Sequence, residues 1–145
     1  MKKPYEILIE TLGLKPHPEG GAFAEIFRSG RTVQPGDGRA PRSALTVIYF
    51  LLRSAQQSRW HRVRSDEVWI WIAGAPLLLF EADAPGGSAG RIALGPLGEG
   101  SPVHVVPADR WQAARTTGEY TLVSCTVGPG FDFADFEMVD VALPD

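Results

Sequence analysis

The segment that decides the fold is Ser58-Arg59-Trp60-His61-Arg62-Val63-Arg64-Ser65-Asp66-Glu67-Val68-Trp69-Ile70-Trp71-Ile72-Ala73-Gly74. If it is extended, alternate side chains share a face. One face then carries His61, Val63, Ser65, Glu67, Trp69 and Trp71. An imidazole, a carboxylate and two large aromatic rings on one face are typical of a pocket wall. The alternative is structural, with the two tryptophans filling the core and His61 and Glu67 forming a satisfied buried pair.

The composition bounds the class of protein. The 145 residues are 44% hydrophobic and 21% charged, which predicts one globular domain, 1–145, with one core. The formal net charge of -3 and the lack of a Lys/Arg block argue against nucleic-acid binding. The single cysteine, Cys125, excludes an internal disulfide framework and suits a reducing compartment. Without a signal peptide or membrane span at the N-terminus, we expect a soluble cytoplasmic protein that does not bind membranes.

The remaining pattern predicts an all-β protein. A short helix is expected over about 4–13, since Pro4 suits a first helical position and Gly13 can end the helix. Beyond it, glycine- and proline-rich turns separate short apolar runs, which predicts a sandwich or barrel over about 20–138. The expected strands are Ala22–Arg28, Ala44–Leu52, Ser58–Val63, Glu67–Ile72, Leu77–Glu81, Arg91–Leu94, Val103–Val106, Gln112–Arg115 and Tyr120–Val127.

Two segments before the decisive one carry candidate residues. The run 14–21, with two prolines and two glycines, predicts a rigid corner that delivers the next strand to a sheet, and the functional alternative places Glu19 or Glu25 at a pocket rim. Residues 29–43 are polar and basic, which predicts a mobile loop over the barrel mouth or a subunit contact. We favour a solvated loop over the alternative that its arginines, with Arg28, attract an anionic ligand to the rim. Ala44–Leu52, which includes Tyr49, is apolar on both faces and is expected to be a central strand.

A second polar cluster follows in 104–115. Gln112 is expected either in the pocket or bonded to a neighbouring backbone, with Trp111 facing the opposite way. For His104 we favour a surface or hydrogen-bonded structural role over a ligand role, and for Cys125 a buried, inert thiol. The aromatic tail that contains Phe133 is interpreted as hydrophobic closure of the barrel, with contact to a ligand as the alternative.

These residues resemble the cupin superfamily. Its first motif, G-x5-H-x-H-x3,4-E-x6-G, matches here as His61, Val63, Glu67 and Gly74. Its second motif, G-x5-P-x-G-x2-H-x3-N, meets Pro107, Asp109, Gln112 and Thr116. Longer strings resemble one branch, the DUF985 or Cupin_5 family: Pro16–Gly21, Ile48–Leu52, Trp60–Val63, Ser65–Glu67, Ala73–Pro76, Val106–Ala108, Trp111–Ala114 and Thr126–Phe133.

The resemblance implies a double-stranded β-helix, the RmlC-like jelly-roll barrel, with a pocket inside its wider end. It also implies a homodimer that exchanges N-terminal strands. It implies fold more firmly than chemistry.

The departures from the cupin motifs concern metal binding. A metal-binding cupin uses two histidines and a glutamate from the first motif and a third histidine from the second. Those positions hold His61, Val63, Glu67 and Gln112 here. Valine cannot ligate a metal and a glutamine amide is a weak ligand, so we expect no firm cofactor, only a weakly bound divalent metal on His61, Glu67 and Gln112.

Three functions stay open at this point, and catalysis itself is undecided. The first is a binding module for a small polar or cyclic ligand, with Glu67, Trp69, Trp71, Gln112, Glu25 and Phe133 as the binding residues. The second is a metal-independent epimerase or isomerase of a sugar-nucleotide-like substrate, with His61 as base and Tyr49 as acid. The third is a divalent-metal-dependent enzyme with a degenerate site.

Overall fold

We describe the protein from a computed structural model that covers residues 1–145. Helix α1 (Pro4–Leu12) has Pro4 in its first turn and ends at Gly13, whose φ of 65° places it in the left-handed region. At its N-terminus the Glu6 side chain accepts a hydrogen bond from the Lys3 backbone N–H. No helix in the structure is both long enough and apolar enough to span a bilayer.

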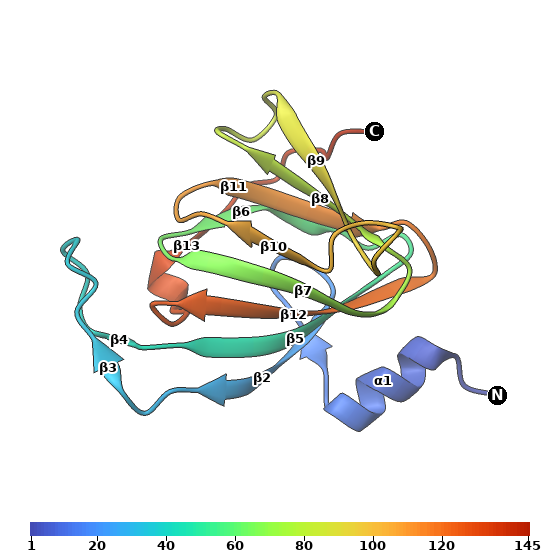
Figure 1. The fold of residues 1–145 in the computed structure, drawn as a ribbon, viewed down its shortest axis with the longest axis horizontal. Coiled ribbons are helices and arrows are strands. Elements are labelled where there is room, and N and C mark those ends of the chain that lie inside the picture. The colour runs from blue at the N-terminus through green and yellow to red at the C-terminus, as the bar shows by residue number, and fades with distance from the viewer.

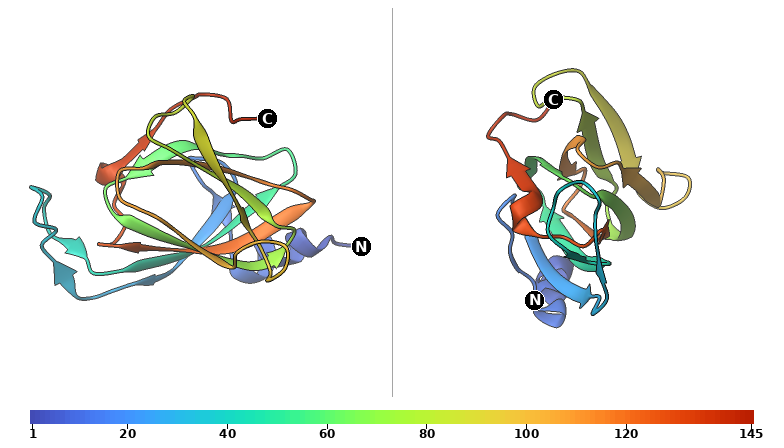
Figure 2. Two further views of the ribbon diagram at one scale, coloured as in Figure 1. Left: turned by 45° about the horizontal axis from the view of Figure 1, so that its top comes forward. Right: turned by 90° about the vertical axis from the view of Figure 1, so that its left-hand side faces the viewer.

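Two antiparallel sheets form the body of the molecule (Figure 1). The larger contains, in spatial order, β1 (Lys15–Pro16), β2 (Ala22–Arg28), β5 (Thr46–Arg53), β12 (Tyr120–Gly128), β7 (Asp66–Gly74) and β10 (Val103–Val106). The smaller contains β13 (Phe136–Met138), β6 (Ser58–Val63), β11 (Trp111–Thr116), β8 (Leu77–Ala82) and β9 (Ala89–Leu94). The sheets curve around a common interior (Figure 2), which confirms the predicted jelly-roll barrel. All nine predicted strands are present, within a few residues at each end.

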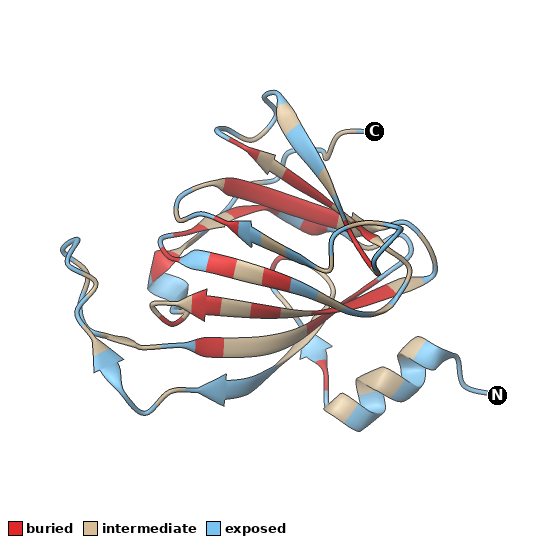
Figure 3. Ribbon diagram, viewed as in Figure 1, coloured by how far each residue is buried: buried red, intermediate tan, exposed pale blue.

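The core lies between the two sheets, and the buried segments of the central strands mark it in Figure 3. Its largest members include Phe50, Trp69, Leu79 and Val123. Strand β5 is buried on both faces, as predicted for a central strand: Phe50 faces the barrel interior, while Leu51 belongs to a second cluster beneath α1. A third cluster, Trp60, Phe80, Ala82, Trp111 and Ala113, lies outside the smaller sheet and packs against Val139 and Leu143 of the C-terminal tail.

Residues 29–43 extend from the barrel as a hairpin formed by β3 (Thr32–Val33) and β4 (Arg42–Ser43), visible on the left of Figure 1. The hairpin is tied to the 3-10 turn Phe133–Asp135 by ion pairs. Arg39 Nη1 lies 3.0 Å from Asp135 Oδ2, and Arg42 Nη2 lies 2.9 Å from Asp135 Oδ1. We call Arg39, Arg42 and Asp135 the arginine clamp. These contacts fix one conformation of a segment that the sequence predicted to be mobile.

Candidate functional site

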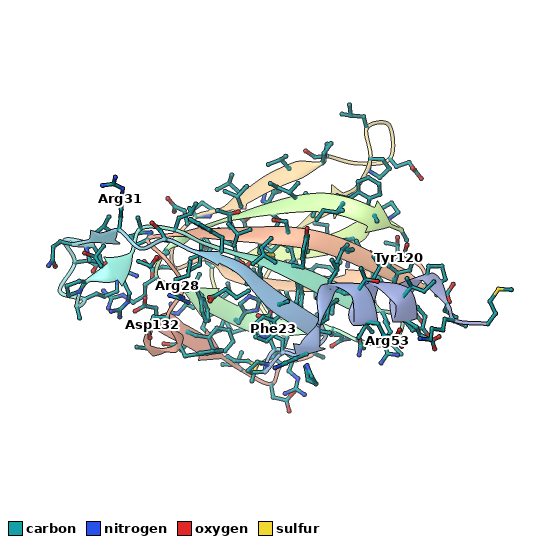
Figure 4. All side chains as sticks on the ribbon, turned by 90° about the horizontal axis from the view of Figure 1, so that it is seen from below. Phe23, Arg28, Arg31, Arg53, Tyr120 and Asp132 are labelled. Atoms are coloured by element: carbon teal, nitrogen blue, oxygen red, sulfur yellow. The ribbon has the colours of Figure 1, made fainter.

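A cavity of about 360 Å³ opens at one end of the barrel. Its exposed rim includes Arg28 on β2 and Asp132 in the loop after β12, which lie at the same end of the barrel in Figure 4. Half of the lining is hydrophobic and includes four phenylalanines. The lining residues are His17, Glu19, Phe23, Glu25, Arg28, Thr46, Ile48, His61, Val63, Glu67, Cys125, Val127, Phe131, Asp132, Phe133 and Phe136.

Strand alternation places the inner side chains. His61 and Val63 of β6 both line the cavity, as the alternation predicted, and Glu67 of β7 joins them. Glu19 arrives from the segment between β1 and β2. Glu19, His61 and Glu67 are 6%, 2% and 8% exposed, so they form the closed end of the cavity. We call these three residues the cavity floor.

The centre of the floor is a contact between His61 and Glu19. His61 Nδ1 lies 2.7 Å from the Arg59 carbonyl oxygen, which can only accept, so Nδ1 carries a proton and donates it. The other ring nitrogen, Nε2, then faces Glu19 Oε2 at 3.0 Å. One proton shared between these two atoms completes the hydrogen bond and leaves the pair without net charge.

Burial decides where that proton lies. It raises the pKa of Glu19 to about 8, and the nearby Ser58 hydroxyl, which has no hydrogen-bond partner of its own, does not reverse the rise. Burial also lowers the pKa of His61, against the opposing effects of Glu67 and the Arg59 carbonyl. At neutral pH, Glu19 is therefore a carboxylic acid that donates to a neutral imidazole.

A second hydrogen-bonded chain fixes Glu67. Trp69 Nε1 donates to Gln112 Oε1 at 2.8 Å, and Gln112 Nε2 donates to Glu67 Oε1 at 2.8 Å. Gln112 lies opposite His61 in the β11–β6 ladder, so the second motif meets the first through strand register. Burial raises the pKa of Glu67 to about 7, although His61 and the Gln112 amide favour the charged form. The pKa of the buried Cys125 thiol is raised, mainly by burial and also by Glu67, as expected for an inert thiol.

The corner 14–21 both turns the chain and supplies the floor. Gly20 has a φ of 118°, and a Cβ there would lie 1.9 Å from the Gln57 carbonyl oxygen, so only glycine fits. The Glu19 backbone N–H donates to His17 Nδ1 at 3.1 Å. Burial lowers the pKa of His17 to about 4, with a further contribution from His61, so His17 is neutral. The rigid corner and the site residue, two alternatives in the sequence, occur together.

The structure brings together only part of the predicted site. Glu67, Glu25 and Phe133 line the cavity, whereas Trp69 and Gln112 lie behind Glu67 as its support. Trp71 lies outside the lining and its indole N–H points to the Ala75 carbonyl at 3.4 Å.

Tyr49 requires a correction of the base and acid assignment. The even-numbered residues Thr46 and Ile48 of β5 face the cavity, so Tyr49 points to the opposite face and packs in the cluster beneath α1. The pairing of His61 with Tyr49 as base and acid therefore does not occur in this structure. His104 likewise lies outside the cavity, where it contacts Glu81 at 2.9 Å, the hydrogen-bonded structural role we favoured for it.

The sequence pattern gave no role in the cavity to His17 or Phe23, whereas Arg28 was expected among the basic residues of the rim and Phe136 in the aromatic tail. It placed Glu19 at the rim, whereas the structure places it on the floor. The proline and glycine spacing around Glu19 was a usable signal, since a corner with this many constraints presents its side chains in a fixed direction. No local signal joined Glu19 to His61, because their contact depends on how the β1–β2 corner packs on β6.

The residues do not fit a resident metal ion. Val63 occupies the second histidine position, and no three His, Cys, Asp or Glu side chains are arranged to hold a metal. The Gln112 oxygen already accepts from Trp69, and His61 Nε2 is in contact with Glu19. The predicted set of His61, Glu67 and Gln112 therefore lacks free donor atoms converging on one point.

A jelly-roll barrel with His61 and Glu67 on consecutive strands that belong to opposite sheets, and with the second motif paired to the first, defines a cupin. The chain belongs to the family described as Cupin superfamily (DUF985), Cupin_5, whose model matches residues 6–139.

Solved structures agree with this assignment. A hypothetical protein from Leishmania major is similar with 34% identity and a TM-score of 0.86, over 94% of this chain and 88% of that chain. A protein from Shewanella oneidensis has 32% identity and a TM-score of 0.82, over 96% and 85% of the two chains. An oxalate decarboxylase from B. subtilis, at 13% identity and TM-score 0.61 over 86% of this chain and 29% of its own, shares the fold alone. The comparison with curated proteins found no match.

Proposed function

We propose that the protein binds a small cyclic ligand with polar groups in the barrel cavity. The observation that carries this proposal is the combination of an apolar wall with a polar, buried floor. A cavity of about 360 Å³ suits a ligand of small-metabolite size. Phe23, Phe133 and Phe136 offer ring surfaces, while the floor offers donors and acceptors that fix orientation.

A screen of cyclic fragments with a structural readout tests this proposal. We expect hits that raise the thermal midpoint and whose density lies in the cavity against the Phe136 ring, which itself stacks on the His61 ring with centroids 5.6 Å apart. Phe136→Ala should weaken these hits, whereas Phe80→Ala, in the cluster outside the smaller sheet, should not change their position. Fragments that bind only elsewhere on the protein would contradict the proposal.

A second candidate, metal-independent isomerisation by proton transfer, is favoured by the fixed tautomer of His61. The Arg59 carbonyl holds one proton on Nδ1, so Nε2 can accept a proton from a substrate carbon once the substrate displaces the Glu19 carboxyl group from it. Glu19 takes the place expected for Tyr49 as the neighbouring acid. A sugar-nucleotide diphosphate finds little support here, because the rim arginine, Arg28, already pairs with Glu25 at 2.6 Å.

Solvent deuterium exchange tests the catalytic candidate. Wild-type protein in D2O should incorporate deuterium at the acidic carbon of a cyclic carbonyl substrate found in the screen. His61→Asn should abolish the exchange and Glu19→Gln should slow it. Equal exchange in wild type and His61→Asn would remove the proposal of catalysis and leave ligand binding.

We also propose that the protein forms a homodimer through the edge of β2. Beyond its two-residue pairing with β1, this edge is free, and Ile26 and Phe27 are 47% and 51% exposed. Light scattering should give twice the chain mass, and Phe27→Glu should give a monomer. A monomeric wild type across the micromolar range would contradict this assembly.

A further inference from the structure

We infer that the ligand of the cavity is a small organic ammonium ion, whose charged nitrogen lies against Glu67 and whose apolar body lies against the phenylalanine rings. This inference deepens the proposed function and rests on it, since it assigns the charge class of the ligand. The balance of charged groups around the cavity, the phenylalanine cluster at its wall and the hydrogen bonds of its polar atoms all favour such a ligand.

The lining is short of positive charge. It contains four carboxyl side chains, Glu19, Glu25, Glu67 and Asp132, but only one arginine, Arg28. The arginine is already engaged, because its Nη2 lies 2.6 Å from Glu25 Oε1 and 3.1 Å from the Phe131 carbonyl oxygen. An anionic ligand would therefore enter a cavity whose one arginine is already paired, and the carboxylates of Glu67 and Asp132 would repel it.

The floor itself has no cationic side chain as a partner. Glu19 forms contacts of ion-pair length only with His61 at 3.0 Å and His17 at 4.0 Å. Glu67 accepts a neutral amide hydrogen bond from Gln112 and forms no ion pair with a lysine or arginine. Buried carboxylates are normally paired with a positive charge. Glu19 carries a proton, but the Glu67 carboxylate has no such partner, so the floor has room beside Glu67 for a charge that the ligand can supply.

The aromatic wall favours an organic cation over a hydrated metal ion. Phe131, Phe133 and Phe136 form a cluster with ring centroids 4.8 to 6.0 Å apart and interplanar angles of 69° to 85°. The negative face of such rings attracts ammonium groups, most strongly where water is excluded. Phe133 is 55% exposed despite lining the cavity, so its ring is available to a ligand that enters from solvent.

Three probes of similar size, each with one ring but with different charge, test the inference: benzylamine, benzyl alcohol and benzoate. Calorimetry at pH 7.5 should show benzylamine binding at least tenfold more tightly than benzyl alcohol, with benzoate weakest. Glu67→Gln should weaken benzylamine binding far more than benzyl alcohol binding, which removes most of the preference for the amine. Glu137→Gln, at an exposed position outside the cavity, should keep the preference. If Glu67→Gln does not fold, the ranking of the three probes on wild type still decides the question.

The outcomes separate the two proposals. Binding of benzyl alcohol or benzoate as tight as that of benzylamine would overturn the ammonium assignment and leave the ligand-binding cavity in place. Zinc or manganese that displaces benzylamine and binds more tightly would also overturn it in favour of a metal. If none of the probes binds, and no cyclic fragment of any charge binds in the broader screen, the proposed function and the inference fail together.

Discussion

The arginine clamp and the cavity floor handle a buried carboxyl group in opposite ways. Asp135 and Glu19 are almost equally buried, at 8% and 6% exposed. Asp135 contacts two arginines, and the hydrogen bonds from Arg42 and Arg39 lower its pKa despite burial. Glu19 contacts only imidazoles, and burial raises its pKa to about 8. Two arginines compensate the charge of Asp135, whereas Glu19 is uncharged because it carries a proton.

The difference distinguishes a structural ion pair from a site. In the clamp, fixed ion pairs join the hairpin to the turn before β13, and both Asp135 oxygens have an arginine partner. In the floor, the groups change charge near neutral pH and face a cavity. Titratable groups perturbed by burial and grouped in a pocket are typical of functional sites. The comparison also predicts opposite responses of stability to pH.

The largest expected effect is the alkaline loss of stability caused by Glu19. Its pKa is about 8 when folded, against 4.5 for the ordinary side chain. Below pH 4.5 it is protonated in both states; as the pH rises toward 8 only the unfolded state loses the proton. The free energy of unfolding therefore falls over this window, by roughly 4 kcal/mol at most. Glu19→Gln cannot ionise and should flatten the curve, measured by urea unfolding from pH 5 to pH 8.5.

The control for this experiment is Glu137→Gln, since Glu137 has a side chain 60% exposed. It should keep the wild-type slope. An unchanged slope in Glu19→Gln would show that Glu19 is not the group that titrates, and the contrast with Asp135 would be lost.

The next largest effect is expected in the clamp. Asp135→Ala leaves two arginines without their shared carboxylate and should lower the free energy of unfolding at pH 7 by about 2 kcal/mol. Because the pKa of Asp135 is lowered from 3.8, its stabilisation is present above that value and is lost as the pH falls through its folded pKa. The deficit of the variant should therefore shrink toward pH 2.5. Asp140→Ala, at an exposed residue, should behave as wild type, and an equal loss in both would contradict the clamp.

The alternation of side chains along β6 and β7 was enough to predict much of this site. His61, Val63 and Glu67 face the cavity because side-chain direction in a strand is a local property. Alternation did not predict where Trp69 and Trp71 lie relative to the cavity. Both share the face of Glu67 on β7, but only the start of β7, with Glu67, borders the cavity. How far a cavity extends along a strand depends on which elements cover it.

The role of Glu19 could not be predicted from local pattern. Its contact with His61 crosses 42 positions, and its burial comes from the packing of the corner against Ser58 and the phenylalanine cluster. The arginine clamp could not be predicted for the same reason, since Arg42 and Asp135 are 93 positions apart in the sequence. The prediction of the fold, by contrast, rested on many short sequence segments in the right order along the chain. A wrong expectation for a single residue therefore did not change it.

A smaller effect is expected from restoring the missing metal ligand. Val63 lines the cavity two residues from His61 on the same face, so Val63→His would place a second imidazole beside His61 and Glu67. Two histidines and a carboxylate form a strong set for Ni²⁺ or Co²⁺. Calorimetry should show binding at least tenfold tighter than in wild type, roughly 1.4 kcal/mol. The control Val63→Leu should resemble wild type, and tight binding by wild type would contradict the misfit described above.

The smallest effect tests how the floor is supported. Trp69→Phe removes the indole N–H that donates to Gln112 Oε1, which leaves a buried acceptor without its partner and loosens the amide that bonds Glu67. Trp71→Phe is the matched control, because it removes the same volume of side chain but only a 3.4 Å bond to the Ala75 carbonyl at a partly buried position. Urea unfolding should show Trp69→Phe less stable than Trp71→Phe by about 1 kcal/mol. Equal losses would mean that packing alone, and not the hydrogen-bonded chain, holds Glu67 in place.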